Sequence, residues 1–356
     1  MILISGGGIV GSHLATRIAR HDDVRVVEEH DNFHKTCSAL ITTPNDIPRQ
    51  FITNRIRTAR IMAPDGKCIE VTFKRPDVVF ARDEYVAYLA GKAQDAGVQY
   101  CQPAKIRSVT KKVCVEDLRT KQRQMFMPDL LVGADGALST VGKETGLLQQ
   151  RTHFVATKTI VKYKHNNSIT FYPFVRDFAW VIPHDEDTAE IGIAARQDVS
   201  RTFTAFCQRL NITPAKREAA IIPWYSAKQP IYKQQGNMHV ALVGDAAGQV
   251  KATTGGGIIY GMKAAIILAD CIRKDKLHAY PRLIKKNIGR ELSLHLQARR
   301  LMDKMTIPDW NRAIALFQDS RLQNVLGNSS RDRLSRLAFK SIVTKPQLLQ
   351  FAKLLF

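Results

Sequence analysis

The chain has 356 residues, of which 45% are hydrophobic and 24% charged, a balance typical of a globular protein large enough for two domains. The most apolar stretch, residues 255–272, contains Lys263 and Asp270, so the sequence predicts no membrane-spanning helix. The six cysteines are far apart and form no C-x-x-C pair, which argues against a metal site or a disulfide framework and favours a reducing, cytoplasmic compartment.

The net charge of +21 is unusual, and much of it lies in residues 273–356. Such a charge attracts polyanions, either nucleic acid or the anionic face of a membrane. The plainer alternative is a set of solvated basic faces without a partner.

The first 28 residues have the pattern of a β-α-β unit. Residues 1–5 are expected to form a strand rather than a signal peptide, and residues 6–11 a glycine-rich turn. Apolar residues at helical spacing predict a helix over 9–20, and residues 24–28 form the second strand.

A hairpin and a helix follow. Residues 55–62 and 68–74 are predicted to be strands joined by a turn at Pro64-Asp65-Gly66. A helix is expected from Asp83 to Ala96, with Asp83 as its N-cap and Gly97 as its C-terminal stop.

The middle of the chain alternates as strands do, and helices dominate from Gly257 onward. The predicted strands are Thr157–Tyr163, Ser168–Tyr172, Ala179–Ile182 and Ala189–Ala194. This order predicts an α/β (α+β) fold, in which a Rossmann-like nucleotide-binding domain is interrupted by an antiparallel-sheet substrate domain and followed by a helical C-terminal region. The expected boundaries are 1–50, 76–150 and 236–280 for the first domain, 51–75 and 151–235 for the second, and 281–356 for the helical region.

The first stretch with chemical content is the glycine turn. Gly6 permits a tight turn, Gly8 lets the backbone approach a diphosphate, and Gly11 allows close packing of helix and strand. Glu28, at the end of the second strand, is placed to bind ribose hydroxyls, and an acid there favours NAD or FAD over NADP. The expected cofactor contacts of this segment are Gly6, Gly8, Ile9, Val10, Gly11, Glu28 and Glu29.

Two more strand-end motifs follow in order. The first is Gly-Ala-Asp135-Gly, and the second is Gly244-Asp245-Ala-Ala-Gly248, followed by Thr-Thr-Gly-Gly-Gly at 253–257 where a helix opens. Either motif alone is also compatible with a strand–turn–helix joint capped by an aspartate. The expected cofactor contacts here are Asp135, Gly244, Asp245, Gly248, Gly255, Gly256 and Gly257.

Together, the three motifs resemble the flavoproteins built like para-hydroxybenzoate hydroxylase. The resemblance implies an FAD-binding domain in which Asp245 binds the ribityl chain and the helix after residue 257 points its N-terminus at the flavin ring. A positive helix end there stabilises the negative charge of reduced flavin.

A narrower resemblance is to the geranylgeranyl reductases of the archaeal digeranylgeranylglycerophospholipid type. It rests on Gly-Asp-Ala-Ala-Gly with Thr-Thr-Gly-Gly-Gly-Ile, and on the cysteine segment that begins at Cys37. It rests also on Arg82, which by this resemblance contacts the cofactor, and on the segment Phe178-Ala-Trp180-Val-Ile-Pro. The chain departs from the family pattern at Gly142, Val175, Phe178 and Ile182, and these departures concern the substrate more than the flavin.

The resemblance implies reduction of isolated C=C bonds in polyprenyl chains of a membrane lipid. The reaction couples a hydride from FAD with a proton, in a dry cavity lined by residues such as Phe171, Phe178 and Trp180. Cys37 is expected beside the flavin as a candidate proton donor; the alternative is a small buried hydrophobe. Trp180 either touches substrate or belongs to the core of the sheet domain.

The basic C-terminal region has a use under this hypothesis, because its basic and apolar residues are mixed as in an interfacial helix. The protein is then expected in the cytoplasm, peripherally on the inner face of the membrane, with no specific nucleic-acid partner. The electron donor is open between ferredoxin, NAD(P)H and a deazaflavin. The second hypothesis is an FAD-dependent aromatic monooxygenase, and the third a basic, non-catalytic flavoprotein that binds membrane or nucleic acid.

Overall fold

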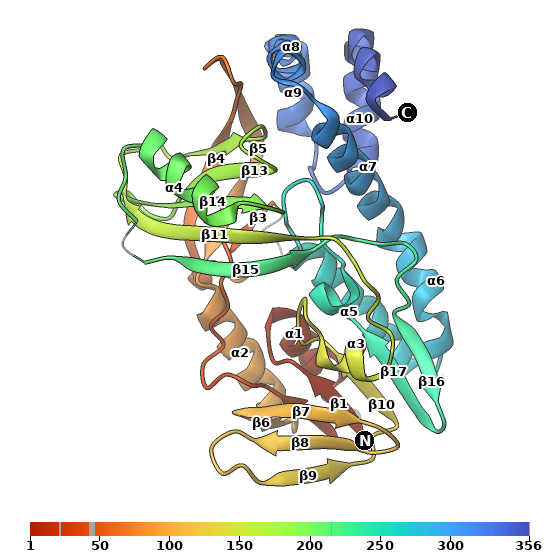
Figure 1. Ribbon diagram of the computed structural model, residues 1–356. Coiled ribbons are helices and arrows are strands. Elements are labelled where there is room, and N and C mark those ends of the chain that lie inside the picture. The colour runs from red at the N-terminus through yellow and green to blue at the C-terminus, as the bar shows by residue number, and fades with distance from the viewer. Residues whose placement is uncertain (21–22, 43–46, 215, 356) are drawn as a thin grey trace.

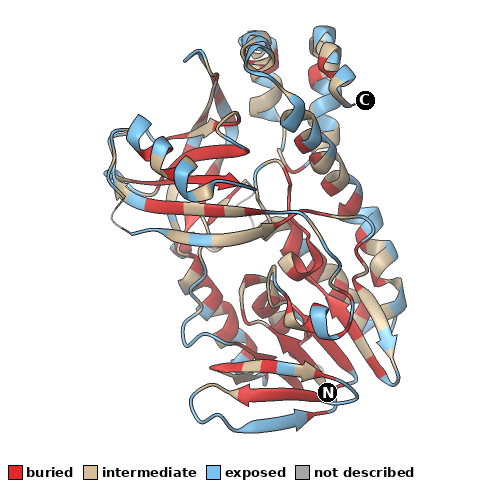
Figure 2. Cartoon of the chain, in the orientation of Figure 1, coloured by how far each residue is buried: buried red, intermediate tan, exposed pale blue. Residues whose placement is uncertain are grey.

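The computed structural model describes residues 1–20, 23–42, 47–214 and 216–355, and it contains three sheets (Figure 1). The largest two lie one above the other in this view, and a group of C-terminal helices stands beside them. Most residues of the strands in both large sheets are buried (Figure 2).

The six-stranded sheet has the order β16-β17-β10-β1-β2-β6 and is parallel except for β16. Its strands are β1 (Ile2–Ser5), β2 (Val24–Val27), β6 (Gln99–Cys101), β10 (Leu130–Gly133), β16 (Tyr232–Gln235) and β17 (Met238–Leu242). Helix α1 (Ile9–Ile18) joins β1 to β2 and packs on α2 (Arg82–Asp95) and α5 (Ile258–Arg273). These elements confirm the predicted β-α-β unit. Its apolar residues are buried, as expected for a parallel sheet that is covered on both faces.

One detail of α2 differs from the expectation. The helix begins at Arg82, its N-cap is Ala81, and no side chain caps it. The Asp83 carboxylate instead accepts a hydrogen bond from Arg82 and contacts His34, so the prediction of Asp83 as the N-cap was wrong. Gly97, with φ +98°, ends the helix as predicted.

The eight-stranded sheet has the order β15-β11-β14-β13-β12-β4-β5-β3. Its strands are β3 (Leu40–Ile41), β4 (Ile52–Met62), β5 (Cys68–Phe80), β11 (His153–Lys162), β12 (Ser168–Tyr172), β13 (Phe178–Pro183), β14 (Thr188–Ala195) and β15 (Glu218–Pro223). The β4–β5 hairpin and the four strands of the middle segment were predicted. The sheet is not wholly antiparallel, however, because β12 pairs with β4 in parallel.

The rest of the chain covers these sheets. The small antiparallel sheet of β7 (Ala104–Val109), β8 (Val113–Asp117) and β9 (Arg123–Phe126) was not predicted. The other helices are α3 (Thr140–Glu144), α4 (Val199–Arg209), α6 (Tyr280–Ile284), α7 (Arg290–Lys304), α8 (Ile307–Phe317), α9 (Ser320–Asn328) and α10 (Leu334–Thr344). The α/β (α+β) class and the helical C-terminal region are confirmed, and the exact domain boundaries stay a prediction. Within the described ranges, no helix is both long and apolar enough to cross a bilayer.

Candidate cofactor and substrate site

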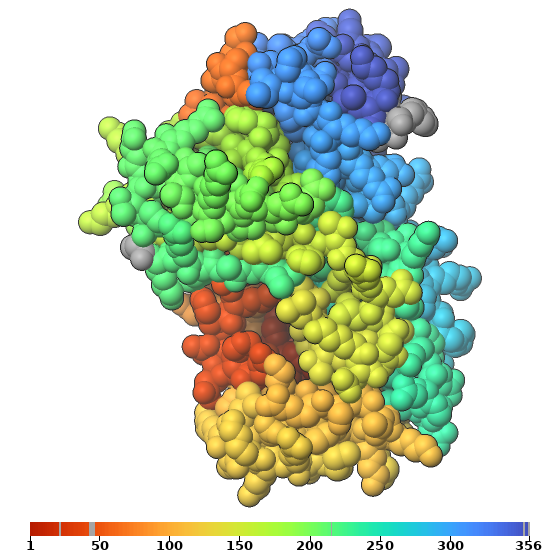
Figure 3. Space-filling model, in the orientation of Figure 1, coloured from red at the N-terminus to blue at the C-terminus, as the bar shows by residue number. Residues whose placement is uncertain are grey.

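A cavity of about 1240 Å³ lies where the two large sheets and the C-terminal helices meet. Its lining runs from the glycine turn after β1, past the loop after β2, to β11, β13 and β15 and on to residues of α7 through α10. Figure 3 shows the surface hollowed between the N-terminal segment, in red, and the yellow segment to its right. The cavity therefore joins the predicted nucleotide-binding turn to the predicted substrate sheet.

The glycine turn has the geometry that a diphosphate needs. A Cβ on Gly11 would lie 1.9 Å from the Gly6 carbonyl oxygen, so the packing of the turn requires a glycine here whether or not a cofactor binds. A Cβ on Gly8 would meet only the Arg82 Nη2, at 3.8 Å, so Gly8 faces open space. Arg82 is buried and anchored through Nη1 to the Phe33 carbonyl oxygen (2.8 Å) and to Asp83. A cation and a bare backbone thus face the same space at the N-terminus of α1.

Glu28 lies at the carboxyl end of β2, as predicted. Its Oε2 accepts a hydrogen bond from the Gly7 amide (2.7 Å), and its Oε1 accepts one from the His30 amide (2.9 Å). His30 Nδ1 also lies 2.9 Å from Oε1, so Oε2 is the oxygen that keeps a lone pair for a ribose hydroxyl. Glu29, next in the chain, pairs with Lys105 (2.7 Å), and both residues line the cavity.

Asp135 lines the cavity, but its carboxylate is engaged by its own turn. Oδ1 accepts a hydrogen bond from the Ser139 hydroxyl (2.6 Å) and Oδ2 one from the Val141 amide (3.1 Å). Burial raises the pKa of Asp135, and these hydrogen bonds oppose the rise. The N-cap of α3 is nevertheless Ser139, whose hydroxyl accepts from the Gly142 amide (2.8 Å), so Asp135 supports that cap and takes a place in the cavity wall.

Asp245 forms an ion pair with Lys35, whose Nζ lies 2.8 Å from Oδ2. Burial raises the pKa of Asp245, but Lys35, with Arg151 and Arg82, more than offsets it and holds the pKa below the ordinary value. Arg151 also donates to the carbonyl oxygens of Ala137, Asp245 and Ala246, and so fastens the two turns together. The cavity thus has an ionised carboxylate at the position that the resemblance assigns to the ribityl chain.

Helix α5 begins beside this carboxylate. Its N-cap is Gly257, and no side chain caps its first turn. The loop before it closes on itself, because the Lys251 amide donates to the Gly256 carbonyl oxygen (3.1 Å). The free amides of the first turn therefore remain available to a negatively charged group in the cavity.

The far part of the cavity is apolar. Phe178 stands between Phe171 and Trp180, with ring centroids 5.6 and 5.8 Å away. Opposite this sheet face, the helices contribute Ala298, Met302, Phe317 and Leu326 to the lining. Phe178 and Trp180 are core residues of the sheet and also line the cavity, so the core alternative for Trp180 is confirmed and its contact with substrate stays a prediction.

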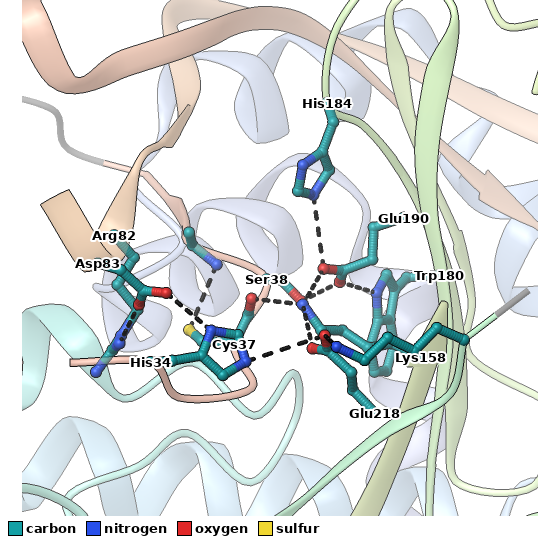
Figure 4. A network of polar contacts seen from close by, with 12 residues as sticks. His34, Cys37, Ser38, Arg82, Asp83, Lys158, Trp180, His184, Glu190 and Glu218 are labelled. Atoms are coloured by element: carbon teal, nitrogen blue, oxygen red, sulfur yellow. Dashed lines mark hydrogen bonds and ion pairs between the residues drawn. The ribbon is translucent and has the colours of Figure 1, made fainter. Parts of the chain in front are cut away.

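A buried polar cluster lies at the cavity wall around Lys158, and Figure 4 shows its contacts. Glu190, fully buried on β14, accepts hydrogen bonds from Lys158 Nζ (2.8 Å), Trp180 Nε1 (2.7 Å) and the Ser38 hydroxyl. Lys158 also donates to the Cys37 carbonyl oxygen (2.8 Å). Burial raises the pKa of Glu190, but its hydrogen-bond partners and the Lys158 charge more than offset this and lower the pKa to about 2.

Sequence reasoning placed Cys37 and Trp180 in the site but missed Lys158 and Glu190. Cys37 lines the cavity, and its Sγ accepts a hydrogen bond from the Ala39 amide (3.4 Å). A charged residue in each of two apolar strands was the available signal. Their pairing joins residues 32 positions apart, which the strand pattern alone does not specify.

A second polar group was also missed, at the link between α9 and α10. Asp332 accepts from Lys251 Nζ (2.7 Å), and its carbonyl oxygen accepts from the Tyr260 hydroxyl (2.7 Å). His295, whose pKa burial and Lys251 lower to about 3, shares a hydrogen bond with Thr253 (2.8 Å). These contacts attach the C-terminal helices to the nucleotide side of the cavity.

Most of the residues proposed from the sequence line this one cavity. They are Gly6, Gly8, Ile9, Val10, Glu28, Glu29, Cys37, Arg82, Asp135, Phe178, Trp180, Asp245, Gly255, Gly256 and Gly257. Gly11, Gly244 and Gly248 shape the backbone behind it, and the last two have φ of +69° and +67°. Nowhere in the described ranges do three or more His, Cys, Asp or Glu side chains gather as metal ligands.

No model of a protein family matches the chain. It is 23% identical to digeranylgeranylglycerophospholipid reductase 1 of Methanothermobacter thermautotrophicus, over 96% of both chains. It is 27% identical to geranylgeranyl diphosphate reductase of Rhodobacter capsulatus, over 72% of this chain and 71% of the relative.

Solved structures show the same fold. A geranylgeranyl bacteriochlorophyll reductase-like protein from Thermoplasma acidophilum superposes with a TM-score of 0.85 at 19% identity, over 100% of this chain and 98% of the other. The myxobacterial chondrochloren halogenase, described as FAD-dependent, superposes with a TM-score of 0.67 at 16% identity, over 96% of both chains. The chain therefore has the fold of the FAD-dependent oxidoreductases, and its predicted resemblance to the geranylgeranyl reductases is confirmed.

Proposed function

We propose that the protein is an FAD-dependent reductase of isolated C=C bonds in geranylgeranyl chains, acting in membrane-lipid biosynthesis. The observation that carries the proposal is the single cavity, which joins a dinucleotide-binding turn to an apolar chamber. The similarity to proteins named as reductases of geranylgeranyl lipids supports the substrate class.

The residues present fit FAD. Gly8 and Arg82 leave open space for the diphosphate, Glu28 is available to the ribose, and Asp245 to the ribityl chain. The uncapped N-terminus of α5 lines the cavity and would stabilise the negative charge of a reduced flavin bound there. When bound, the cofactor supplies a hydride equivalent to the alkene.

The apolar chamber suits a prenyl chain. Phe171, Phe178 and Trp180 on one side and the helical residues on the other leave few groups that could hold water against the double bond. Cys37 is assigned to the edge of this chamber, beside the flavin, where its thiol is one candidate for the group that gives the proton.

The outer face of α10 is proposed to rest on an anionic membrane at the cytoplasmic side. Phe339 and Val343, one turn apart, are 70% and 65% exposed, and Arg336 and Lys340 are exposed beside them. On the same helix, Leu334 and Leu337 line the cavity. Apolar and basic residues on one exposed face suit the interface of an acidic bilayer, where the lipid substrate lies. An external electron donor, whether ferredoxin, NAD(P)H or a deazaflavin, completes the reaction.

The test is anaerobic. The purified protein is reduced with dithionite and mixed with a digeranylgeranyl glycerophospholipid, while flavin reoxidation and lipid mass are followed. We expect reoxidation together with a gain of two hydrogens for each bond reduced. Flavin that stays reduced over unchanged lipid contradicts the proposal. NAD(P)H consumption with oxygen and a phenol would then favour the aromatic monooxygenase.

A further inference from the structure

Reduction of an alkene consumes a proton in a chamber built to exclude water. The chamber wall on the eight-stranded sheet is otherwise apolar at this point, where β11 presents Ala156 and β13 presents Trp180 and Ile182. Lys158, between them, lines the cavity with a side chain only 8% exposed. A buried lysine–glutamate pair contributes little to stability compared with apolar residues of the same size. Its presence in a prenyl chamber therefore calls for a chemical role.

The cluster around Lys158 extends from the chamber towards the surface. Glu190 lies behind Lys158, and His184 Nε2 lies 3.6 Å from Glu190 Oε2. The His184 side chain is 22% exposed, whereas that of Glu190 is 0% exposed. A second acid, Glu218, lies 3.7 Å from Lys158 and reaches towards the exposed His34 (Figure 4). The exposed fraction of the side chain thus falls from His184 to Glu190, and Lys158 lies at the cavity wall.

We propose that Lys158 is the acid that protonates the alkene, and that Glu190 and His184 return protons to it from the surface. The inference rests on the proposed function. One alkene carbon receives a hydride with its two electrons from the reduced cofactor, and the other receives a proton from Lys158 Nζ. The π bond breaks, two C–H bonds form, and Lys158 is left as a neutral amine, which regains a proton through Glu190 and His184. Cys37, whose thiol lies at the same edge, is the competing donor.

The decisive variant is K158R, because arginine keeps the positive charge and can donate to Glu190 but does not release a proton. Reduced K158R is mixed anaerobically with the digeranylgeranyl glycerophospholipid, after its flavin content has been shown to match the wild type. We expect the rate of flavin reoxidation to fall by about 10²-fold or more, the typical contribution of a general acid. K162M, on the same strand but exposed, is the matched control and should react like the wild type. A wild-type rate in K158R, or an equal loss in C37A alone, overturns the inference.

A second measurement separates proton donation from mere positioning of the Cys37 segment. In K158A the vacated space can admit ethylammonium, which carries a transferable proton, or methylguanidinium, which carries only charge. Saturable rescue by ethylammonium alone is expected. Equal rescue by both cations would reduce Lys158 to a charge that holds the segment in place, and rescue by neither would overturn the inference. Inactivity of the wild type towards the lipid would instead refute the proposed function itself.

Discussion

Lys35 Nζ lies 2.8 Å from Asp245 Oδ2, although the two residues are 210 positions apart in the chain. The pair joins the loop after β2 to the turn after β17, and both residues line the cavity. Because Lys35 is the main group that offsets burial, it keeps the carboxylate ionised and able to accept strong hydrogen bonds.

Substitution of Lys35 should therefore make cofactor binding sensitive to pH. In K35M, burial of Asp245 is less opposed, so the pKa of its carboxyl rises. FAD affinity should then fall as the pH is lowered through that raised pKa, while wild-type affinity stays level, because its Asp245 remains ionised. Titration of the apoprotein with FAD between about pH 5 and 8 measures this, in the range where a carboxyl with a raised pKa titrates. K35R is the control, and a level profile in K35M would show that Lys35 does not govern the carboxylate.

Two glycines of the first turn should respond differently to alanine. G8A has room for its methyl group without cofactor, so the apoprotein should keep its stability, while FAD affinity falls by about 10-fold or more as the methyl meets the diphosphate. G11A places Cβ against the Gly6 carbonyl oxygen and should lower both stability and cofactor content. Thermal unfolding and flavin titration of the two apoproteins separate these effects. Unimpaired FAD binding by G8A would show that the diphosphate does not bind at this turn.

Gly192 holds Trp180 in place. An alanine Cβ there would lie 2.3 Å from Trp180 Cζ2, so G192A must displace the indole that donates to Glu190. We expect weaker binding of the prenyl lipid with unchanged FAD affinity, measured as the KM for lipid beside a flavin titration. G91A, in α2 with open space around its Cβ, is the matched glycine-to-alanine control. Unchanged lipid kinetics in G192A would show that Trp180 does not contact the substrate.

Replacing one partner of the Lys158–Glu190 pair should destabilise the protein more than replacing both partners together. K158M and E190Q each leave a buried charge without its main partner and should lower the free energy of unfolding by about 3–5 kcal/mol. The double variant K158M/E190Q should lose clearly less than the sum of the two. Denaturant unfolding of the four proteins gives the coupling free energy, and strict additivity would mean that the pair is not electrostatically coupled.

The exposed face of α10 can be tested with vesicles. F339S/V343S should reduce binding to vesicles rich in phosphatidylserine, and added salt should weaken wild-type binding because the basic residues act through the surface potential. M125S/M127S, in and directly after β9, removes exposed apolar side chains elsewhere and serves as the control. Equal vesicle binding by both double variants would place the membrane contact on another surface.

Local patterns predicted much of the fold. Alternation and helical spacing gave β1, α1 and β2, and the strands around Trp180, because each follows from the burial of its own side chains. Asp83 was misassigned because its carboxylate has better partners in Arg82 and His34 than the end of its own helix. The parallel pair of β12 and β4 joins distant segments, which local alternation cannot specify.

The part of the candidate site that the sequence predicted is the part where the backbone itself requires a glycine or an aspartate. Gly8, Asp245 and the segment 255–257 stand at strand or helix ends, and such positions can be read from spacing. Lys158 and Glu190 have no such local signal in the sequence, because a strand tolerates many residue types at each position. Only the contact between the two side chains shows that they belong to the site.

The contacts of Asp332 determine when this site can first exist during biosynthesis. Its carboxylate accepts from Thr42, near the start of the chain, and from Lys251, and it lies in the link to α10. The ribosome must therefore release residue 332 before the cavity wall can close. Contacts that span so much of the sequence fold slowly, so the cofactor should meet a chain synthesised at least to residue 332 rather than a nascent first domain.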